Sequence, residues 1–286
     1  MSIQPVAGIH RNQVWRVRTA DGATALMLKL QTTREGFPTV EHEADVLRHL
    51  RWLAGVPRLV AAGTVGRPKR PFLLTQAISG VPLAHWLRLD RPAAASQLAN
   101  YAHWLRSFSL VDAPRAILRE KACRFEGPWA MNYSPDVAPP VIINDASAGD
   151  RLAANHNHVA VVHGSFDPRN VLVADDATAQ LTGVVDFEAT RLGSPLIDIA
   201  GLALHFLMWR RADLASAWLT AASEAWQWPS LAIDAMPYLV AQHERRRAAA
   251  MVNTDVPIAP RRLISNLLAT IKTLQPRSNR STSHGS

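Results

Sequence analysis

Two short polar segments of the sequence carry side chains that could do chemistry. They read HGSFDPRN at 163–170 and VVDFE at 184–188, and apolar runs beside both predict β-strands. Asn170 and Asp186 lie at corresponding ends of two of these strands, so both could face one hard divalent cation. Mg²⁺ takes few protein ligands, mostly oxygens, and shares its other positions with phosphate. The two segments therefore predict a magnesium site that could also hold a phosphate compound.

A lysine interrupts an apolar strand in the N-terminal part of the chain. The run ATALMLKL at 23–30 predicts a strand in which Lys29 points away from the face of its leucine neighbours. Glu43 lies on the apolar face of a helical pattern over 40–54. A buried carboxylate needs a cation, because an unpaired buried charge costs about 3–5 kcal/mol. We therefore expect Lys29 and Glu43 to pair; the alternative is a surface lysine on a half-exposed strand.

The elements that must position these groups change in character along the chain. Strand patterns dominate the first 80 residues, at 13–18, 23–30, 58–65 and 71–78. Helical patterns dominate the remainder, at 83–87, 93–108 and over most of 196–272. The sequence thus predicts an N-terminal lobe at 1–80, a helical lobe at 81–274 and a disordered tail at 275–286. A Pro- and Asn-rich stretch at 124–150 predicts a long loop or insertion.

The two polar segments resemble motifs of the aminoglycoside phosphotransferase and choline kinase group. The family loop reads His-Gly-Asp, four variable residues and Asn, which His163, Gly164 and Asn170 match. The second motif, Asp-Phe-Glu followed by Gly-x-Pro-x-x-Asp, is matched over 186–198. The resemblance covers roughly residues 5–205. It implies an α+β, two-lobed protein-kinase-like fold, with a small antiparallel-sheet N-lobe and a larger, mainly helical C-lobe.

The resemblance also implies a role for each matching residue. Lys29 would hold the α- and β-phosphates of ATP with Glu43 orienting it, while Asn170 and Asp186 would bind Mg²⁺. The segment 74–78, with Gln76 and Ile78, would form the interlobe hinge that contacts the adenine. Asp198 would brace the catalytic loop. His163 would pack within that loop, with a direct chemical role as the lesser alternative.

Ser165 departs from the family pattern, which has at this position the Asp that accepts the proton of the acceptor hydroxyl. A serine cannot act as this base at neutral pH without a base of its own. In one interpretation Asp167, two residues further on, compensates, because phosphoryl transfer depends mainly on positioning and charge. In a second, the chain is a pseudokinase that binds a nucleotide or a partner. In a third, Ser165 is an engineered substitution.

The composition limits the acceptor and the partners. After residue 200 basic residues outnumber acidic ones by two to one, which disfavours a polycationic acceptor. We therefore expect an ATP-dependent O-phosphotransferase that acts on a neutral or anionic hydroxyl compound, or else on Ser/Thr of a peptide. The net charge of +8 comes mainly from dispersed arginines, so nucleic acid is a less favoured partner. The single cysteine and the lack of a signal segment predict a cytoplasmic protein, and the apolar run 196–209 is too short to cross a membrane.

Overall fold

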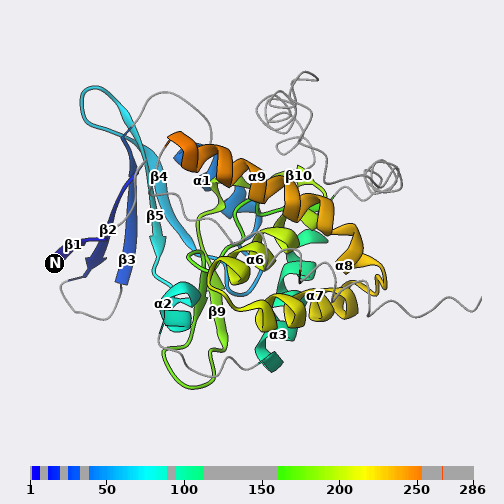
Figure 1. Cartoon of the computed structure of the whole chain (residues 1–286). Helices are drawn as coiled ribbons and strands as arrows, with labels where there is room; N and C mark the ends of the chain where they lie inside the picture. The colour runs from blue at the N-terminus through cyan, green and yellow to red at the C-terminus, as the bar shows by residue number, and fades with distance from the viewer. Residues whose placement is uncertain are drawn as a thin grey trace, which may run out of the picture.

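The computed structural model describes residues 2–6, 12–19, 25–32, 39–88, 95–111, 160–252 and 266. Figure 1 shows a β-sheet at one side of the described chain and a larger group of helices at the other. The predicted loop at 124–150, the tail at 275–286 and the helical pattern beyond residue 252 lie outside the described residues.

The N-terminal part forms a five-stranded antiparallel sheet in the order β1-β2-β3-β5-β4. Its strands are β1 (Ser2–Pro5), β2 (Asn12–Arg18), β3 (Ala25–Gln31), β4 (Leu59–Val65) and β5 (Arg70–Gln76). The four predicted strands are present with ends shifted by one or two residues. The first strand was not predicted, because its sequence SIQP has neither alternation nor β-branched enrichment.

Helix α1 (Val40–His49) lies between this sheet and the rest of the molecule. Thr39 caps it by accepting a hydrogen bond from the backbone N–H of His42 at 3.1 Å. The helix ends five residues before the predicted end at 54. The segment that follows turns instead, and the carbonyls of Ala54 and Gly55 accept hydrogen bonds from Trp104 Nε1 and the Val184 N–H, both at 2.8 Å. Tertiary contacts have thus replaced the last helical turn.

Helices make up most of the described C-terminal part. They are α2 (Leu83–Arg88), α3 (Ala95–Ser109), α6 (Leu196–Met208), α7 (Ala212–Trp226), α8 (Leu231–Asp234) and α9 (Met236–Val252). Helix α6 is buried along almost its whole length, as its apolar sequence predicts, and packs against α7 and α9. Trp218 on α7 donates from its indole nitrogen to the Ile199 carbonyl at 2.9 Å. The core of this part is therefore built around α6.

Two small sheets connect the helices to the polar segments. One contains β6 (Val81–Pro82), β8 (Val171–Val173) and β9 (Leu181–Val184), and the other pairs β7 (Ala160–Val162) with β10 (Arg191–Gly193). Strands β8 and β9 are antiparallel with Val171 opposite Val184, so the start of β8 lies beside the end of β9. Asn170 and Asp186 sit at these two ends. Strands β6 and β10 were not predicted, because two or three residues carry no readable period.

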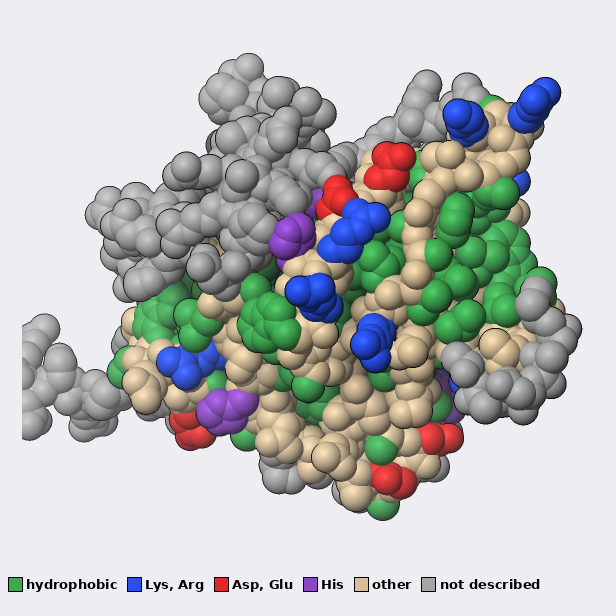
Figure 2. All heavy atoms as spheres, turned by 180° about the vertical axis from the view of Figure 1, so that it is seen from behind, with side chains coloured by type: hydrophobic (Ala, Val, Ile, Leu, Met, Phe, Trp, Pro, Cys, Tyr) green, Lys and Arg blue, Asp and Glu red, His purple; other side chains and the backbone are tan. Residues whose placement is uncertain are grey.

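The face shown in Figure 2 carries its charges in mixed groups. Lys and Arg side chains lie there among Asp, Glu and His, and hydrophobic side chains gather over the region of the five-stranded sheet. Within the described residues, no helix is long and apolar enough to cross a membrane. This agrees with the expectation for the run 196–209, which forms α6.

Candidate active site

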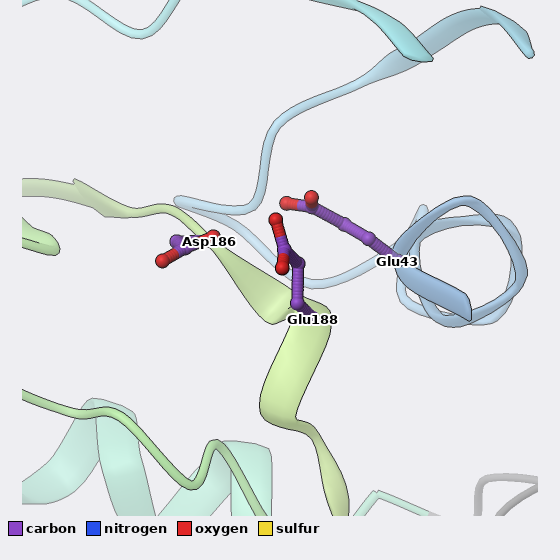
Figure 3. Close-up of side chains that lie close together, drawn as sticks. All are labelled: Glu43, Asp186 and Glu188. Atoms are coloured by element: carbon purple, nitrogen blue, oxygen red, sulfur yellow. The ribbon is translucent and has the colours of Figure 1, made fainter. Parts of the chain in front are cut away.

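Lys29 lies at the centre of a group of carboxylates from distant parts of the chain. Its Nζ lies 2.7 Å from Glu43 Oε2 and 2.6 Å from Asp186 Oδ1, and it also contacts Glu188 Oε1. Figure 3 shows the three carboxylates converging, one from α1 and two from the segment that follows β9. The Lys29–Glu43 pair forms as the sequence predicts.

The burial of this group sets its electrostatics. The side chains of Lys29, Glu43 and Glu188 are 12%, 5% and 10% exposed, whereas Asp186 is 43% exposed. Burial acts to lower the pKa of Lys29, but the carboxylates of Glu43, Asp186 and Glu188 outweigh it and raise that pKa above its ordinary value. Lys29 is therefore a permanent cation that joins the sheet to the C-terminal part.

Glu188 is the third carboxylate around this lysine. Burial raises its pKa to about 7, and the neighbouring Asp186 and Glu43 add to that effect while Lys29 opposes it. Asn12 at the start of β2 donates a hydrogen bond from its amide to Glu188 Oε1. The sequence drew attention to Glu188 as part of the second motif, but gave no sign of its contacts with Lys29 and Asn12.

Asp186 has an unusual backbone. Its φ of 71° and ψ of 60° place it in the left-handed region, just before the short 3₁₀ helix η1 (Phe187–Ala189). Glu43 Oε1 holds this turn by accepting the Phe187 N–H at 3.1 Å. The Asp186 carboxylate after this turn is partly exposed, so a ligand could reach it.

Asn170 and Ser165 form the other side of the site. Asn170 Nδ2 donates to Ser165 Oγ at 2.6 Å and to the Ser165 carbonyl at 2.9 Å. The Val185 N–H donates to the Asn170 carbonyl at 2.9 Å, which holds the backbones on the two sides of the site together. The amide nitrogen of Asn170 is thus committed to Ser165, and its amide oxygen is the atom that could bind a cation.

The donor set fits a hard divalent ion. An amide oxygen from Asn170 and a part-exposed carboxylate from Asp186 are both oxygen ligands of the kind that Mg²⁺ prefers. The oxygens of Glu43, Asp186 and Glu188 also lie within 4.8 Å of one another. The ammonium of Lys29 already contacts all three, so this group is a less suitable ion site than the outer edge of Asp186.

Asp198 ties the loop 163–170 to α6. Its two carboxylate oxygens accept the backbone N–H groups of His163 at 2.6 Å and Gly164 at 2.8 Å. Gly164 has a φ of 79°, and a Cβ there would lie 2.4 Å from the Ala189 carbonyl oxygen, so only glycine permits this turn. Burial raises the pKa of Asp198, although the N–H groups oppose that rise.

His163 is fully buried at the start of the loop. Its Nε2 lies 3.1 Å from the Val185 carbonyl and therefore carries the proton, and its ring packs edge-on against Phe187 at 4.8 Å between centroids. These contacts suit the packing role that the resemblance implies for His163.

Asp167 is buried, and both of its carboxylate oxygens accept hydrogen bonds from Arg169. Its Oδ1 accepts from the Arg169 N–H at 2.8 Å and from Nε at 3.1 Å, and its Oδ2 accepts from Nη2 at 2.6 Å. His205 on α6 lies 3.8 Å from Oδ2. Burial acts to raise the pKa of Asp167, but the bonds from Arg169 outweigh it and the pKa is lowered. The hydrogen bonds of the Asp167 carboxylate thus go to Arg169, whereas the Ser165 hydroxyl bonds to Asn170.

The predicted hinge residues lie where the sheet meets the C-terminal part. Gln76 is exposed at the end of β5, and its N–H donates to the Arg58 carbonyl at 2.8 Å. Ile78 packs against β9, since a Cβ on Gly183 would lie 2.6 Å from Ile78 Cδ1. The roles of Arg169 and His205 had no signal in the sequence, because their partners become clear only once the loop and α6 are placed.

Comparisons with known proteins agree with this architecture. The protein-family model described as "Phosphotransferase enzyme family" matches residues 2–233 of this chain. Viomycin phosphotransferase from Streptomyces vinaceus is 27% identical over 190 residues, which cover 61% of this chain and 65% of that protein. The match thus spans just under two thirds of the relative's length.

Two solved structures share the fold. A thermostable mutant of the aminoglycoside phosphotransferase APH(4)-Ia matches with a TM-score of 0.54 and 13% identity, over 96% of this chain and 93% of that one. An ethanolamine kinase from Plasmodium vivax matches with a TM-score of 0.58 and 12% identity, over 95% of this chain and 80% of that one. The predicted two-lobed kinase-like fold class is therefore confirmed.

Proposed function

We propose a function on the premise that this chain belongs to the phosphotransferase enzyme family, whose model matches residues 2–233. The chain would be a kinase that moves the γ-phosphate of ATP to a hydroxyl group of a small molecule. One observation carries this proposal: Lys29 from the sheet meets Asp186 at 2.6 Å, and Asp186 follows the strand that pairs with the one after Asn170. A cationic clamp and two oxygen ligands would thereby face one place.

Each of these residues has a separate task in the proposal. Lys29, oriented by Glu43, would bind the α- and β-phosphates, and Gln76 and Ile78 would lie near the adenine. Asn170 and Asp186 would hold Mg²⁺, which neutralises charge on the phosphates when it is bound. Because Lys29 contacts Asp186 in this structure, ATP and the ion together would take over the charges that these two side chains now neutralise for each other.

We also propose the division of labour between the lobes that the sequence suggests. Residues 1–80 would bind the nucleotide, and residues 81–274 would supply the catalytic loop, the metal ligands and the acceptor pocket. The use of ATP suits the cytoplasm, which the single cysteine also favours.

The acceptor in this proposal is a neutral or anionic hydroxyl compound of the antibiotic or metabolite type. The names of viomycin phosphotransferase and of the aminoglycoside phosphotransferase support an antibiotic-like acceptor, and that of ethanolamine kinase supports a small alcohol. The basic composition after residue 200 argues against a polycation. No observation on the described residues favours a peptide acceptor.

The test is consumption of ATP against a library of hydroxyl compounds, with Mg²⁺ present. The wild type should turn over with at least one compound, whereas Asp186→Ala and Lys29→Met should lose activity by about 10³-fold or more, because each removes a charge that positions the phosphates. Lys69→Met is the matched control, since Lys69 is exposed in the turn between β4 and β5. Equal rates for the wild type and Asp186→Ala would refute the proposal.

A pseudokinase is the second candidate, and Ser165 is the observation that favours it. In that case the wild type would bind Mg²⁺–ATP, and Asp186→Ala would weaken binding, but no hydroxyl compound would be phosphorylated. Isothermal titration beside the turnover assay distinguishes the two functions, because only the kinase gives ADP and a phosphorylated product.

A further inference from the structure

The loop that carries Ser165 also holds a preformed arginine–carboxylate pair. Three nitrogen atoms of Arg169, its backbone N, Nε and Nη2, donate to the Asp167 carboxylate at 2.8, 3.1 and 2.6 Å. The Arg169 side chain is 70% exposed, whereas that of Asp167 is 6% exposed. A buried anion thus fixes the direction of a guanidinium that stands at the surface of the loop.

This arrangement makes Asp167 a poor general base. Both of its oxygens already accept hydrogen bonds, and the Arg169 bonds lower its pKa despite burial. A base must reach the proton that it abstracts, and its pKa should lie near the working pH. With both oxygens bonded to a guanidinium, Asp167 is poorly suited to accept this proton.

Arg169 is placed where a cation would be useful. It directly precedes Asn170, the proposed metal ligand, and its charge interacts with the Asp186 carboxylate as well as with Asp167. Nε and Nη2 are used by Asp167, which leaves the Nη1 end of the guanidinium to face a ligand. The charge that develops on a transferring phosphoryl group lies on its equatorial oxygens and is stabilised by such donors.

We propose that Arg169 contacts the γ-phosphoryl group during transfer, and that Asp167 is the positioning residue that aims it. In the transfer, the bond from the γ-phosphorus to the bridging oxygen breaks and its electron pair stays on ADP. The acceptor oxygen forms the new bond to phosphorus, and its proton passes to solvent. Arg169 would stabilise the negative charge throughout this step, so that the loop works without a carboxylate at position 165. The inference rests on the proposed function.

Nucleotide binding provides the first test, because it needs no acceptor. We would measure the Kd of ADP and of a non-hydrolysable ATP analogue, both with Mg²⁺, for the wild type and for Arg169→Ala. The variant should bind the analogue about 10-fold more weakly, since one charge-assisted hydrogen bond is lost. ADP lacks the γ-phosphate and should bind within about twofold of the wild type. A merely structural role for Arg169 would affect both nucleotides alike.

The chain offers a matched control for this arginine. Arg211 binds Asp213 two residues away through Nη2 and Oδ2 at 2.7 Å, as Arg169 binds Asp167, but lies at the start of α7. Arg211→Ala should leave both affinities unchanged. Arg169→Lys keeps the charge without the planar fork and should recover part of the analogue affinity. It also serves as the folded variant if Arg169→Ala is unstable.

A double-mutant cycle then separates aiming from base catalysis. If Asp167 acts only through Arg169, Asp167→Ala lowers kcat in the wild-type background and has no further effect in Arg169→Ala. If Asp167 were the base, Asp167→Ala would lower kcat in both backgrounds. Three outcomes would overturn the inference while leaving the proposed kinase standing. They are a loss of kcat on Asp167→Ala in both backgrounds, an equal weakening of ADP and analogue binding in Arg169→Ala, and a rise in the acceptor KM alone. A wild type that binds neither nucleotide overturns both.

Discussion

Ser165 takes part in a hydrogen bond that a carboxylate could also make. Its Oγ accepts from Asn170 Nδ2 at 2.6 Å, and an aspartate at this position could accept the same bond while keeping its second oxygen for a substrate hydroxyl. The absence of the usual aspartate therefore changes the proton chemistry of the loop more than its geometry.

Ser165→Asp should raise kcat with the best hydroxyl acceptor by about 10²-fold, because general base catalysis is typically worth about 10²–10⁴-fold. Steady-state kinetics with an acceptor found in the ATP-consumption assay would measure it. Ser165→Asn is the control, since asparagine has the shape of aspartate but cannot act as a base. A gain in both variants, or in neither, would contradict a missing base at this position.

His205 should make stability depend on pH. Burial lowers its pKa to about 4, and the charges of Arg246 and Arg169 add to this while Asp167 opposes it. An unfolded histidine has a pKa near 6.5, so between about pH 6.5 and 4 the unfolded chain binds a proton that the folded one does not. As the pH falls through that window, the free energy of unfolding should therefore decrease by as much as about 3 kcal/mol.

Urea denaturation at several pH values between 7.5 and 4.5 would measure this dependence. In His205→Gln the part of the slope due to this residue should vanish, although the variant starts from a lower stability at pH 7.5. His85→Gln, in which an exposed histidine on α2 is replaced, should keep the slope of the wild type. An equal slope in His205→Gln would show that other groups carry the pH dependence.

Outside the two motifs, the sequence could identify individual site residues where they contradict their surroundings. Lys29 in an apolar strand and Glu43 on an apolar helix face each needed a partner of opposite charge, and they meet at 2.7 Å. Glu188 and Arg169 sit in polar stretches where a charge needs no explanation. Their contacts depend on how the lobes and the loop are placed, which local pattern does not encode.

At the scale of elements, α6 supports the loop 163–170 through Asp198. One carboxylate holds two buried backbone N–H groups of the turn at Gly164, and the left-handed glycine there keeps both pointing at it. The brace was expected from the resemblance, whereas the depth of its burial depends on α6 being enclosed on all sides.

Asp198→Asn should lower the free energy of unfolding by about 2–4 kcal/mol. The amide offers one oxygen for two buried N–H groups and turns an N–H donor toward one of them, which leaves a buried polar group unsatisfied. Asp213→Asn is the control, because that side chain is 61% exposed and its loss should cost less than about 0.5 kcal/mol. Denaturant titration of both variants measures the difference; equal costs would argue against the brace.

The lengths of the elements explain which of them could be predicted. Strands of seven residues and the long helix α3 show a clear period and were expected within one or two residues, whereas α7 and α9 were expected only as parts of one helical region over 196–272. Strands β6 and β10 have two or three residues and exist because the chain around them is fixed. The end of α1 was misplaced for the same reason, since Ala54 and Gly55 form hydrogen bonds to distant residues.

At the scale of the whole molecule, the two lobes are joined by more than the chain between them. The buried His42 of α1 lies 2.7 Å through Nε2 from the Thr190 carbonyl, and the Gly55 carbonyl accepts from Val184 at 2.8 Å. Lys29 adds its ion pairs with Asp186 and Glu188. Helix α1 thus belongs as much to the C-terminal part as to its own sheet.

The two lobes should therefore unfold together. Far-UV circular dichroism and tryptophan fluorescence should follow one superimposable denaturant transition, because neither lobe keeps its interface groups satisfied alone. A fragment of residues 1–80 should remain unfolded under the same conditions. Two separated transitions, or a folded fragment, would show that the lobes are independent.

The backbone of Asp186 bears on whether this molecule has been kept for catalysis or only for its shape. A left-handed residue with a side chain costs about 1 kcal/mol relative to glycine. A scaffold selected for durability alone would gain by putting glycine there. The cost is explained if a metal ion binds there, because the carboxylate is already in position before the ion binds.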